Sequence, residues 1–197
     1  MRTLKHIFIL LSTWYFVLST SFAQSDEQKL VRDGNKFYKE KKFTEAEKNY
    51  LNALGKQSNS YRGAFNLGDA YYKQGKYKEA SEQFEMLAAK KSSSDTLSKV
   101  YHNLGNSYLK QKEFEKSINA YKNALKQKSD DEDSRYNLAY AQKMLKQQQE
   151  QQKQEQQKKD QEKKDENKEK KDEKEDDKKK DEKMDEKQKQ EQQKQDI

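Results

Sequence analysis

The sequence predicts an all-α protein, a solenoid of helical hairpins followed by a charged low-complexity tail. Two observations predict the hairpins: glycines recur at intervals close to 34 residues, and aromatic residues recur at fixed distances after each glycine. A third observation predicts the tail, because apolar residues almost disappear after residue 145. A segment with so little to bury cannot offset the conformational entropy that folding costs.

Apolar residues are spread unevenly along the 197-residue chain and divide it into three segments. They make up 30% of the whole, but residues 1–23 hold 14 of them and residues 146–197 hold only two. Residues 24–145 can therefore bury a core large enough for one small domain. The chain has no cysteine, which excludes disulfides, a thiolate nucleophile, a zinc–thiolate site and a bacterial lipoprotein anchor.

The first 23 residues show the order of features found in a secretory signal peptide. Basic residues precede an apolar run from Ile7 to Val17, and Ala23 ends a small-residue cleavage site. A retained membrane anchor is the alternative, but the stretch from Ile7 to Phe22 has 16 residues where a bilayer crossing needs about 20. Both alternatives imply export, and we expect the protein in the periplasm.

The repeats are defined by glycines and by residues at fixed distances after them. The glycines are Gly34, Gly68 and Gly105, and the small residues twelve positions later are Ala46, Ala80 and Ser117. Aromatic residues lie nine and sixteen positions after each glycine. We expect each glycine to let the first helix of a hairpin lie close to the second, where the small residue receives the contact. The aromatic residues should fill the gap between successive hairpins, since one hairpin cannot bury its own apolar face.

This pattern resembles the tetratricopeptide repeat (TPR), a helical hairpin with a 34-residue period. The resemblance covers residues 27 to about 145 and implies repeats at about 27–60, 61–97 and 98–131, with a cap helix from residue 132. Three extra residues precede the third repeat. We interpret Ser92 to Asp95 as a lengthened loop there, with a helix N-cap after it.

The tail from residue 146 to residue 197 carries 17 lysines, 18 acidic residues and 14 glutamines. It has no apolar heptad, so a coiled coil is excluded. One interpretation is a rigid charged helix that acts as a spacer. The interpretation we favour is a solvated, fluctuating tail, in which a helix runs on from the cap before it frays. Its net charge of −1 argues against nucleic-acid binding, which requires positive charge.

Residues that could carry chemistry are scarce. The only histidines are His6, in the signal segment, and His102. We interpret one histidine without cysteine as too little for a histidine-based triad or a multi-histidine metal site. No glycine-rich phosphate loop occurs. The sequence therefore predicts a protein that is not an enzyme and that has no metal, no cofactor and no small-molecule substrate.

The TPR resemblance implies a concave groove, lined by the first helices, that binds an extended peptide or a protein surface. The candidate groove residues are Asn35, Tyr38, Arg62, Phe65, Asn66, Asp69, Tyr72, Lys99, His102, Asn103, Asn106, Tyr136, Asn137 and Tyr140. Alternatively, Asn66, Asn103 and Asn137 are only helix residues of the repeat consensus. The lysine–asparagine clamp of chaperone-tail-binding TPR proteins is not reproduced, because Val31 and Phe65 stand where that clamp has lysine.

The order of signal peptide, three repeats, cap helix and Gln/Lys/Glu tail resembles one particular TPR type. The cap phrase from Ser134 to Lys143 and the tail carry this resemblance, which is to the TPR component of the Bacteroides aerotolerance (Bat) operons, the BatC type. It implies a periplasmic scaffold or adaptor in a stress-related envelope complex, with von Willebrand A-domain membrane proteins as partners. The alternative function is a holdase or assembly chaperone for exported proteins.

Cleavage after Ala23 predicts that the exported protein begins at Gln24. Intact-mass spectrometry of the protein purified from periplasmic extract should therefore give the mass of residues 24–197. Ala23→Trp is the control, because a large side chain before the cleavage site should leave the precursor uncut in the membrane. Recovery of the unaltered chain at full length from the membrane would show that the segment is an anchor.

Overall fold

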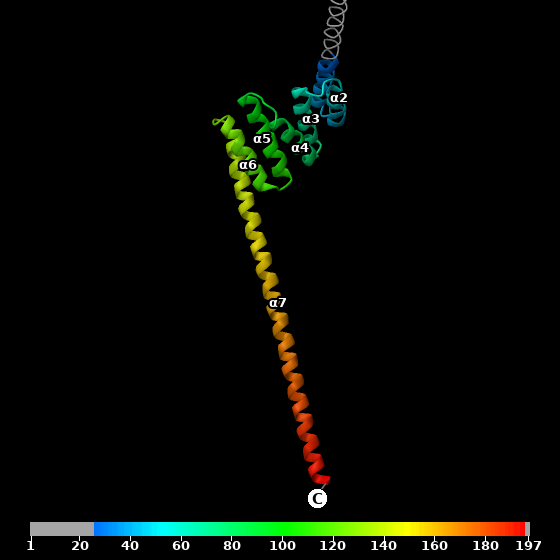
Figure 1. The fold of residues 1–197 in the computed structure, drawn as a ribbon, viewed down its shortest axis with the longest axis vertical. Helices are drawn as coiled ribbons and strands as arrows, with labels where there is room; N and C mark the ends of the chain where they lie inside the picture. The colour runs from blue at the N-terminus through cyan, green and yellow to red at the C-terminus, as the bar shows by residue number, and fades with distance from the viewer. Residues whose placement is uncertain (1–25, 196–197) are drawn as a thin grey trace, which may run out of the picture. The chain divides into compact units, whose positions relative to one another are not determined.

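The computed structural model describes residues 26–195, and every regular element in that range is a helix (Figure 1). The predicted signal peptide lies outside the described residues. Contacts divide the chain into two units, with the boundary between Leu145 and Lys146. Each unit is considered separately below.

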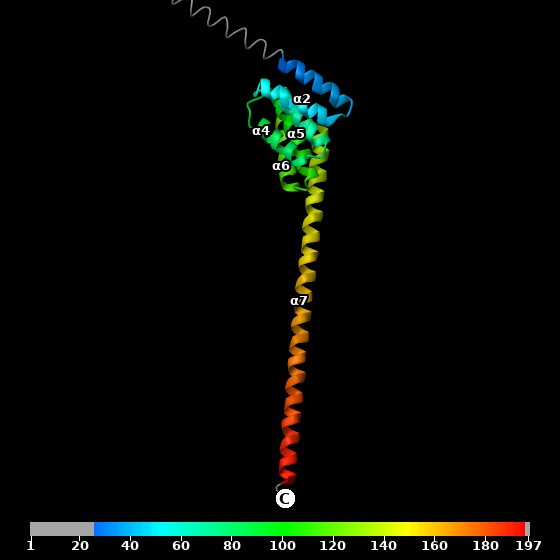
Figure 2. The same cartoon turned by 90° about the vertical axis from the view of Figure 1, so that its right-hand side faces the viewer.

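The first unit is a row of three helical hairpins followed by the start of a long helix. The first hairpin joins a helix over residues 26–39 to α2 (Phe43–Lys56). The second joins α3 (Tyr61–Lys73) to α4 (Tyr77–Ala88), and the third joins α5 (Ser94–Lys110) to α6 (Phe114–Gln127). The last helix is α7 (Glu132–Gln195). From α2 to α6 each helix packs against the next, and α3 also touches α5, so that first helices of successive hairpins are neighbours (Figures 1 and 2).

The glycines lie against aromatic rings of their own hairpins. A Cβ atom added at any of them would come within 3.0 Å of a ring carbon; the pairs are Gly34 with Tyr50, Gly68 with Phe84, and Gly105 with Tyr121. These rings are the residues sixteen positions after each glycine, and they are almost completely buried. The aromatic rings, which we expected between successive hairpins, therefore also make a close contact within each hairpin. Ser117 takes part in it by donating a hydrogen bond to the Gly105 carbonyl at 2.8 Å.

The core is continuous across the hairpins because the same rings also face the next repeat. Phe84 belongs to a cluster with Val100 and Leu104 of α5, which joins the second hairpin to the third. Tyr121 packs with Ala141 of α7, so the start of that helix covers the end of the row. No hairpin buries its apolar face alone, as expected for a solenoid.

The third hairpin differs from our expectation of a lengthened loop over Ser92 to Asp95. Ser93 is the N-cap of α5, and its hydroxyl accepts a hydrogen bond from the Thr96 N–H at 3.3 Å. Ser94 and Asp95 are therefore helical, and α5 has 17 residues against 13 in α3. Asp95 stabilises this added turn because a carboxylate is favourable at a helix N-terminus and because it pairs with Lys99 at 2.7 Å.

The turn inside each hairpin contains one residue in the left-handed region. The residues are Lys41 (φ 60°), Gly75 (φ 78°) and Lys112 (φ 61°), each seven positions after the repeat glycine. This conformation costs a side-chain-bearing residue about 1–2 kcal/mol and glycine almost nothing. The middle hairpin therefore has the least strained turn.

The second unit contains the part of α7 from residue 146 onward. The structure has this segment in helical form as far as Gln195, so the helix does run on from the cap. Its described side chains from residue 149 to residue 164 are all exposed, which agrees with a solvated tail. Among residues 26–195, no helix is both long enough and apolar enough to cross a membrane.

Replacing Gly68 with alanine should destabilise the array. The new Cβ would lie 2.8 Å from Cζ of Phe84, whose ring is completely buried, so the ring or the helices must shift. Overpacking of this kind costs roughly 1–3 kcal/mol, which should lower the melting temperature by roughly 5–15 °C.

Gly55→Ala provides the matched control for this prediction. Gly55 is also helical, but nothing lies within 4 Å of a Cβ added there. Because alanine is the better helix former by about 1 kcal/mol, this variant should melt at or above the temperature of the unaltered protein. Equal melting temperatures for the two variants would show that the ring does not limit the approach of the helices.

Candidate peptide groove

A ladder of amide hydrogen bonds joins the first helices of successive hairpins. Asn66 Nδ2 donates to Asn35 Oδ1 at 2.7 Å, which links α3 to the helix over residues 26–39. Asn103 Nδ2 donates to Asp69 Oδ1 at 2.8 Å, and Asn137 Nδ2 donates to Asn106 Oδ1 at 3.0 Å. The three donors, Asn66, Asn103 and Asn137, thus have a structural role. The three acceptors, Asn35, Asp69 and Asn106, each follow the repeat glycine by one residue. This role agrees with the alternative that they are repeat-framework residues.

Tyrosine hydroxyls from the second helices complete the ladder in the first and third repeats. Tyr50 donates to Asn35 Oδ1 at 2.8 Å, and Tyr121 donates to Asn106 Oδ1 at 2.6 Å. The middle repeat differs at both positions, because the aromatic residue is Phe84 and the acceptor is Asp69. The Asp69 carboxylate therefore has no tyrosine donor corresponding to Tyr50 or Tyr121.

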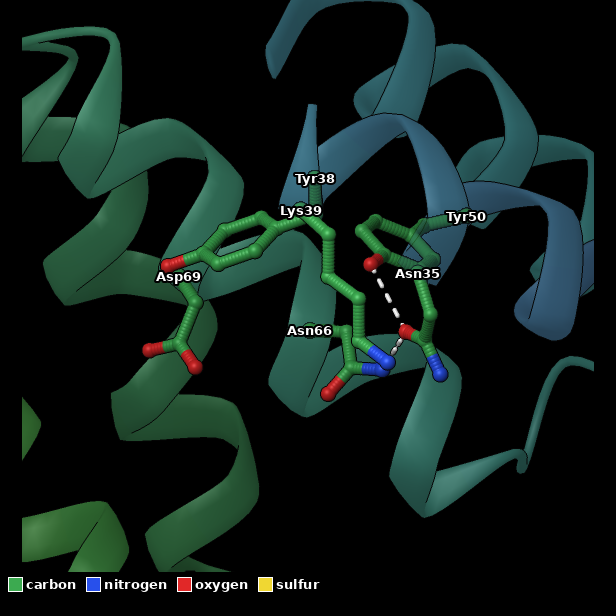
Figure 3. Close-up of a pocket in the computed structure, with 6 residues that line it drawn as sticks. All are labelled: Asn35, Tyr38, Lys39, Tyr50, Asn66 and Asp69. Atoms are coloured by element: carbon green, nitrogen blue, oxygen red, sulfur yellow. Dashed lines mark hydrogen bonds between the residues drawn. The ribbon is translucent and has the colours of Figure 1, made fainter. Parts of the chain in front are cut away.

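Two pockets open on either side of Asp69. The first, which we call the Tyr38 pocket, has a volume of about 230 Å³ and is lined by Asn35, Tyr38, Lys39, Tyr50, Asn66 and Asp69. Figure 3 shows these side chains, with the Tyr38 ring extending toward Asp69. The second, the Tyr72 pocket, has about 220 Å³ and is lined by Tyr38, Asp69, Tyr72, Lys73, Phe84, Asn103 and Asn106. Asp69 and Tyr38 belong to both.

Burial determines the charge state of Asp69. It raises the pKa of this carboxyl group from the ordinary value of 3.8 to about 7, although the nearby Lys73 acts in the opposite direction. Burial, followed by the negative charge of Asp69, also raises the pKa of Tyr38 to about 12. At neutral pH the two pockets therefore share a carboxyl group that is close to its midpoint of ionisation.

A third pocket, the His102 pocket, lies between α3, α5 and the start of α7. Its volume is about 260 Å³, and its lining residues are Phe65, Asp95, Ser98, Lys99, His102, Asn103, Lys128, Asp131 and Asp133. Acidic and basic groups are mixed here, and Lys99 is paired with Asp95. This pocket therefore has no single charge preference.

His102 belongs to a hydrogen-bonded chain that the sequence analysis did not anticipate. Ser134 Oγ donates to Asp131 Oδ2 at 2.7 Å, and His102 Nδ1 lies 2.8 Å from the same Oγ. Since the hydroxyl has one hydrogen, Nδ1 must carry the hydrogen of its own bond. Burial acts to raise the pKa of Asp131, but hydrogen bonds from Ser134 and nearby positive charge hold it below the ordinary value.

This chain of hydrogen bonds corrects our argument that one histidine is too little for a triad. A Ser-His-Asp triad needs only one histidine, and the structure brings His102, Ser134 and Asp131 together. However, serine rather than histidine is in the middle, so no base takes the serine proton. Ser134 is also 0% exposed. The three residues cap α7 and hold it to α5.

Ten of the fourteen candidate groove residues line these three pockets. They are Asn35, Tyr38, Phe65, Asn66, Asp69, Tyr72, Lys99, His102, Asn103 and Asn106. The other four are elsewhere: Arg62 is exposed on α3, Asn137 is in the amide ladder, and Tyr136 and Tyr140 are exposed on α7.

Tyr50 and Phe84 are among the pocket-lining residues that were missing from the candidates, because the sequence analysis treated both aromatic residues as core. Their rings are buried, but the Tyr50 hydroxyl reaches the Tyr38 pocket. A signal was present in the sequence. In the first and third repeats a tyrosine sixteen residues after the glycine accompanies an asparagine one residue after it. In the middle repeat these two positions hold phenylalanine and aspartate.

The described residues contain no group of three histidine, aspartate or glutamate side chains arranged to hold a metal ion. Family models match most of the first unit: one described as a tetratricopeptide repeat matches residues 33–95, and one described as a TPR repeat matches residues 99–146. No curated protein sequence gives a match.

Solved TPR structures resemble the chain. The TPR2AB domain of yeast Sti1, in a complex with pHSP90, is 28% identical with a TM-score of 0.56, over 62% of this chain and 48% of that one. The chain thus spans about half the length of the Sti1 fragment. The first TPR of Spaghetti (RPAP3), bound to the HSP90 peptide SRMEEVD, is 18% identical with a TM-score of 0.57. The match covers 62% of this chain and 94% of that one. The Sgt2 TPR domain of Aspergillus fumigatus is 19% identical with a TM-score of 0.56. The match covers 61% of this chain and 79% of that one. The last two establish a shared fold.

Asp69→Asn should remove the loss of stability that the ionisation of Asp69 causes as pH rises. Because the folded-state pKa of about 7 lies above the ordinary 3.8, the folded protein holds this proton more tightly than the unfolded chain between those values. Stability from Asp69 is therefore full below about pH 4, falls as pH rises to 7 and is then constant.

Thermal unfolding of both proteins from pH 4 to pH 8 measures this difference. The melting temperature of Asp69→Asn should exceed that of the unaltered protein by an amount that grows to roughly 5 °C or more at pH 7. The introduced amide can keep the bond from Asn103, as Asn106 does with Asn137. Asp33→Asn, at an exposed position, is the control, and its melting temperature should change with pH in the same way as that of the unaltered protein. A constant gap at all pH values would contradict the raised pKa.

Proposed function

We propose that this chain, which belongs to the tetratricopeptide repeat family, acts as an exported adaptor that binds protein partners in the cell envelope. TPR repeats indicate a protein–protein interaction scaffold, and no catalytic family matches the chain. The observation that carries the proposal is the row of open pockets along the first helices, formed by ten of the residues expected to contact a ligand.

The periplasm is the proposed location. Its support is the order of features in residues 1–23, basic residues followed by an apolar run and a small-residue cleavage site. The proposed process is the stress-related envelope complex of the Bat type, and its support is the cap phrase from Ser134 to Lys143 together with the charged tail. Von Willebrand A-domain membrane proteins are the partners that this resemblance implies.

Two of the solved neighbours are in complexes with HSP90 or an HSP90 peptide, but the groove of this chain has different chemistry. The RPAP3 domain holds the acidic peptide SRMEEVD. Here, Val31 and Phe65 replace the lysines of the carboxylate clamp, and Asp69 places a carboxyl group inside the groove. A partner that ends in several carboxylates would therefore not find the two clamp lysines and would meet the carboxyl group of Asp69.

A holdase or assembly chaperone is the second candidate, and the exposed aromatic residues of α7 favour it. Tyr136 is 74% exposed and Tyr140 46% exposed, and they are one helical turn apart. Such a pair could contact apolar segments of unfolded exported proteins. The charged tail would then keep the complex in solution.

Affinity capture separates the two candidates. The tagged mature protein is incubated with detergent-solubilised membranes of the source organism, and bound proteins are quantified by mass spectrometry. An adaptor should retain a few defined proteins, with A-domain membrane proteins among them. A chaperone should retain many unrelated polypeptides and should suppress the aggregation of a chemically unfolded model protein.

A pair of variants tests whether the groove is the working surface. Lys39 and Lys73 are exposed and line the Tyr38 and Tyr72 pockets, so Lys39→Glu with Lys73→Glu should strongly change capture, upward for a partner segment with basic residues and downward for an acidic one. Lys48→Glu with Lys122→Glu makes the same change of charge at exposed positions on α2 and α6 and should leave capture intact. Equal capture by both variants would show that the partner binds elsewhere.

A further inference from the structure

We propose that the groove recognises a lysine or arginine side chain of its partner, seated on the Asp69 carboxylate between Tyr38 and Tyr72. This inference rests on the proposed function and adds the chemistry of the partner segment, which is extended and carries a basic residue at the position facing Asp69. Two pockets meet at this carboxylate, so a side chain can approach it from either side.

The Asp69 carboxylate has unused capacity to accept hydrogen bonds. Asn103 Nδ2 donates to Oδ1, and no other hydrogen bond or ion pair reaches either oxygen from the described residues. An ionised carboxylate has about four lone-pair positions, and largely buried acids are normally paired. The corresponding Asn35 and Asn106 each accept two bonds, from an asparagine and from a tyrosine. The middle repeat alone leaves its acceptor open to a ligand.

The groups around Asp69 suit a cation. Tyr38 comes from the helix over residues 26–39 and Tyr72 from α3, and the two rings line the pockets on either side. Aromatic rings attract ammonium and guanidinium groups, and a partly desolvated site strengthens this attraction. The neighbouring α5 contributes only the neutral amides of Asn103 and Asn106, and α4 contributes the Phe84 ring.

The nearby positive charges do not satisfy the carboxylate. Lys39 on the first helix and Lys73 on α3 are exposed and form no ion pair with Asp69. The influence of Lys73 on Asp69 is smaller than the effect of burial, since the pKa remains raised. The remaining titratable groups facing the site are the hydroxyls of Tyr38, Tyr50 and Tyr72, which are neutral at physiological pH.

Cation binding should therefore be linked to the ionisation of Asp69. A bound ammonium favours the charged carboxylate, so binding below the free-state pKa of about 7 must release a proton. The affinity for a cation should consequently fall by about tenfold for each pH unit below 7 and should level off above it.

Three peptides that differ at one position test the proposal on the full mature protein. They are blocked nine-residue peptides of alanine and serine, with lysine, glutamine or glutamate at the centre. Binding is followed by NMR, using the Asn103 side-chain amide that bonds Asp69. We expect the lysine peptide to bind about tenfold tighter than the glutamine peptide at pH 8, and the glutamate peptide to bind most weakly.

Asp69→Asn should reduce the preference for lysine to about twofold or less and should abolish its pH dependence. Circular dichroism checks the fold of this variant, which only introduces the residue type found in the other two repeats. Asp33→Asn, at an exposed position outside the pockets, should keep the full preference.

Three results would overturn the proposal: equal binding of the lysine and glutamine peptides, an unchanged preference in Asp69→Asn, or a free-state Asp69 that titrates at its ordinary pKa. The third would show that solvent or Lys73 already compensates the carboxylate. The capture experiment is independent of these results. If capture finds no partner but the lysine preference holds, the adaptor function fails and the cation pocket stands.

Discussion

The contact between a repeat glycine and the aromatic ring sixteen residues later governs the rest of this structure. It lets the two helices of a hairpin approach until the ring fills the space where a Cβ would lie, as at Gly68 and Phe84. The same ring then faces the next hairpin, where Phe84 meets Val100 and Leu104. One residue thus closes its own hairpin and supplies the surface that the next one needs, so stability is shared between neighbours.

That contact also determines what the groove can offer a ligand. A ring held against the glycine directs its para position toward the first helices, where a tyrosine hydroxyl meets the residue after the glycine. In the outer repeats this consumes the acceptor, as Tyr121 does at Asn106. In the middle repeat, phenylalanine brings no hydroxyl and Asp69 keeps its second oxygen available. The framework of the solenoid and the selectivity of its groove are therefore decided at the same two positions.

The sequence was sufficient to predict the hairpins, because the spacing of Gly34, Gly68 and Gly105 follows from contacts with aromatic rings that leave too little room for a Cβ atom. It was insufficient where side chains act in pairs across repeats. The bond from Asn66 to Asn35 joins residues 31 positions apart, and neither residue type indicates a partner by itself. The start of α5 was misplaced for a related reason, since serine is favoured both in turns and at helix N-caps, and the bond from Thr96 identifies Ser93 as the cap.

A single carboxylate can set the charge preference of a groove that is otherwise rich in lysine. Lys39 and Lys73 are exposed, so water and salt screen them and their pull on a ligand is weak. Asp69 is largely buried, so its charge is screened less and its burial is costly unless a cation compensates it. A partner that brings a lysine or arginine removes this cost, whereas a partner that brings a glutamate increases it. Selectivity then arises from the acid that the fold has left without a counterion, although basic residues are more numerous on the surface around it.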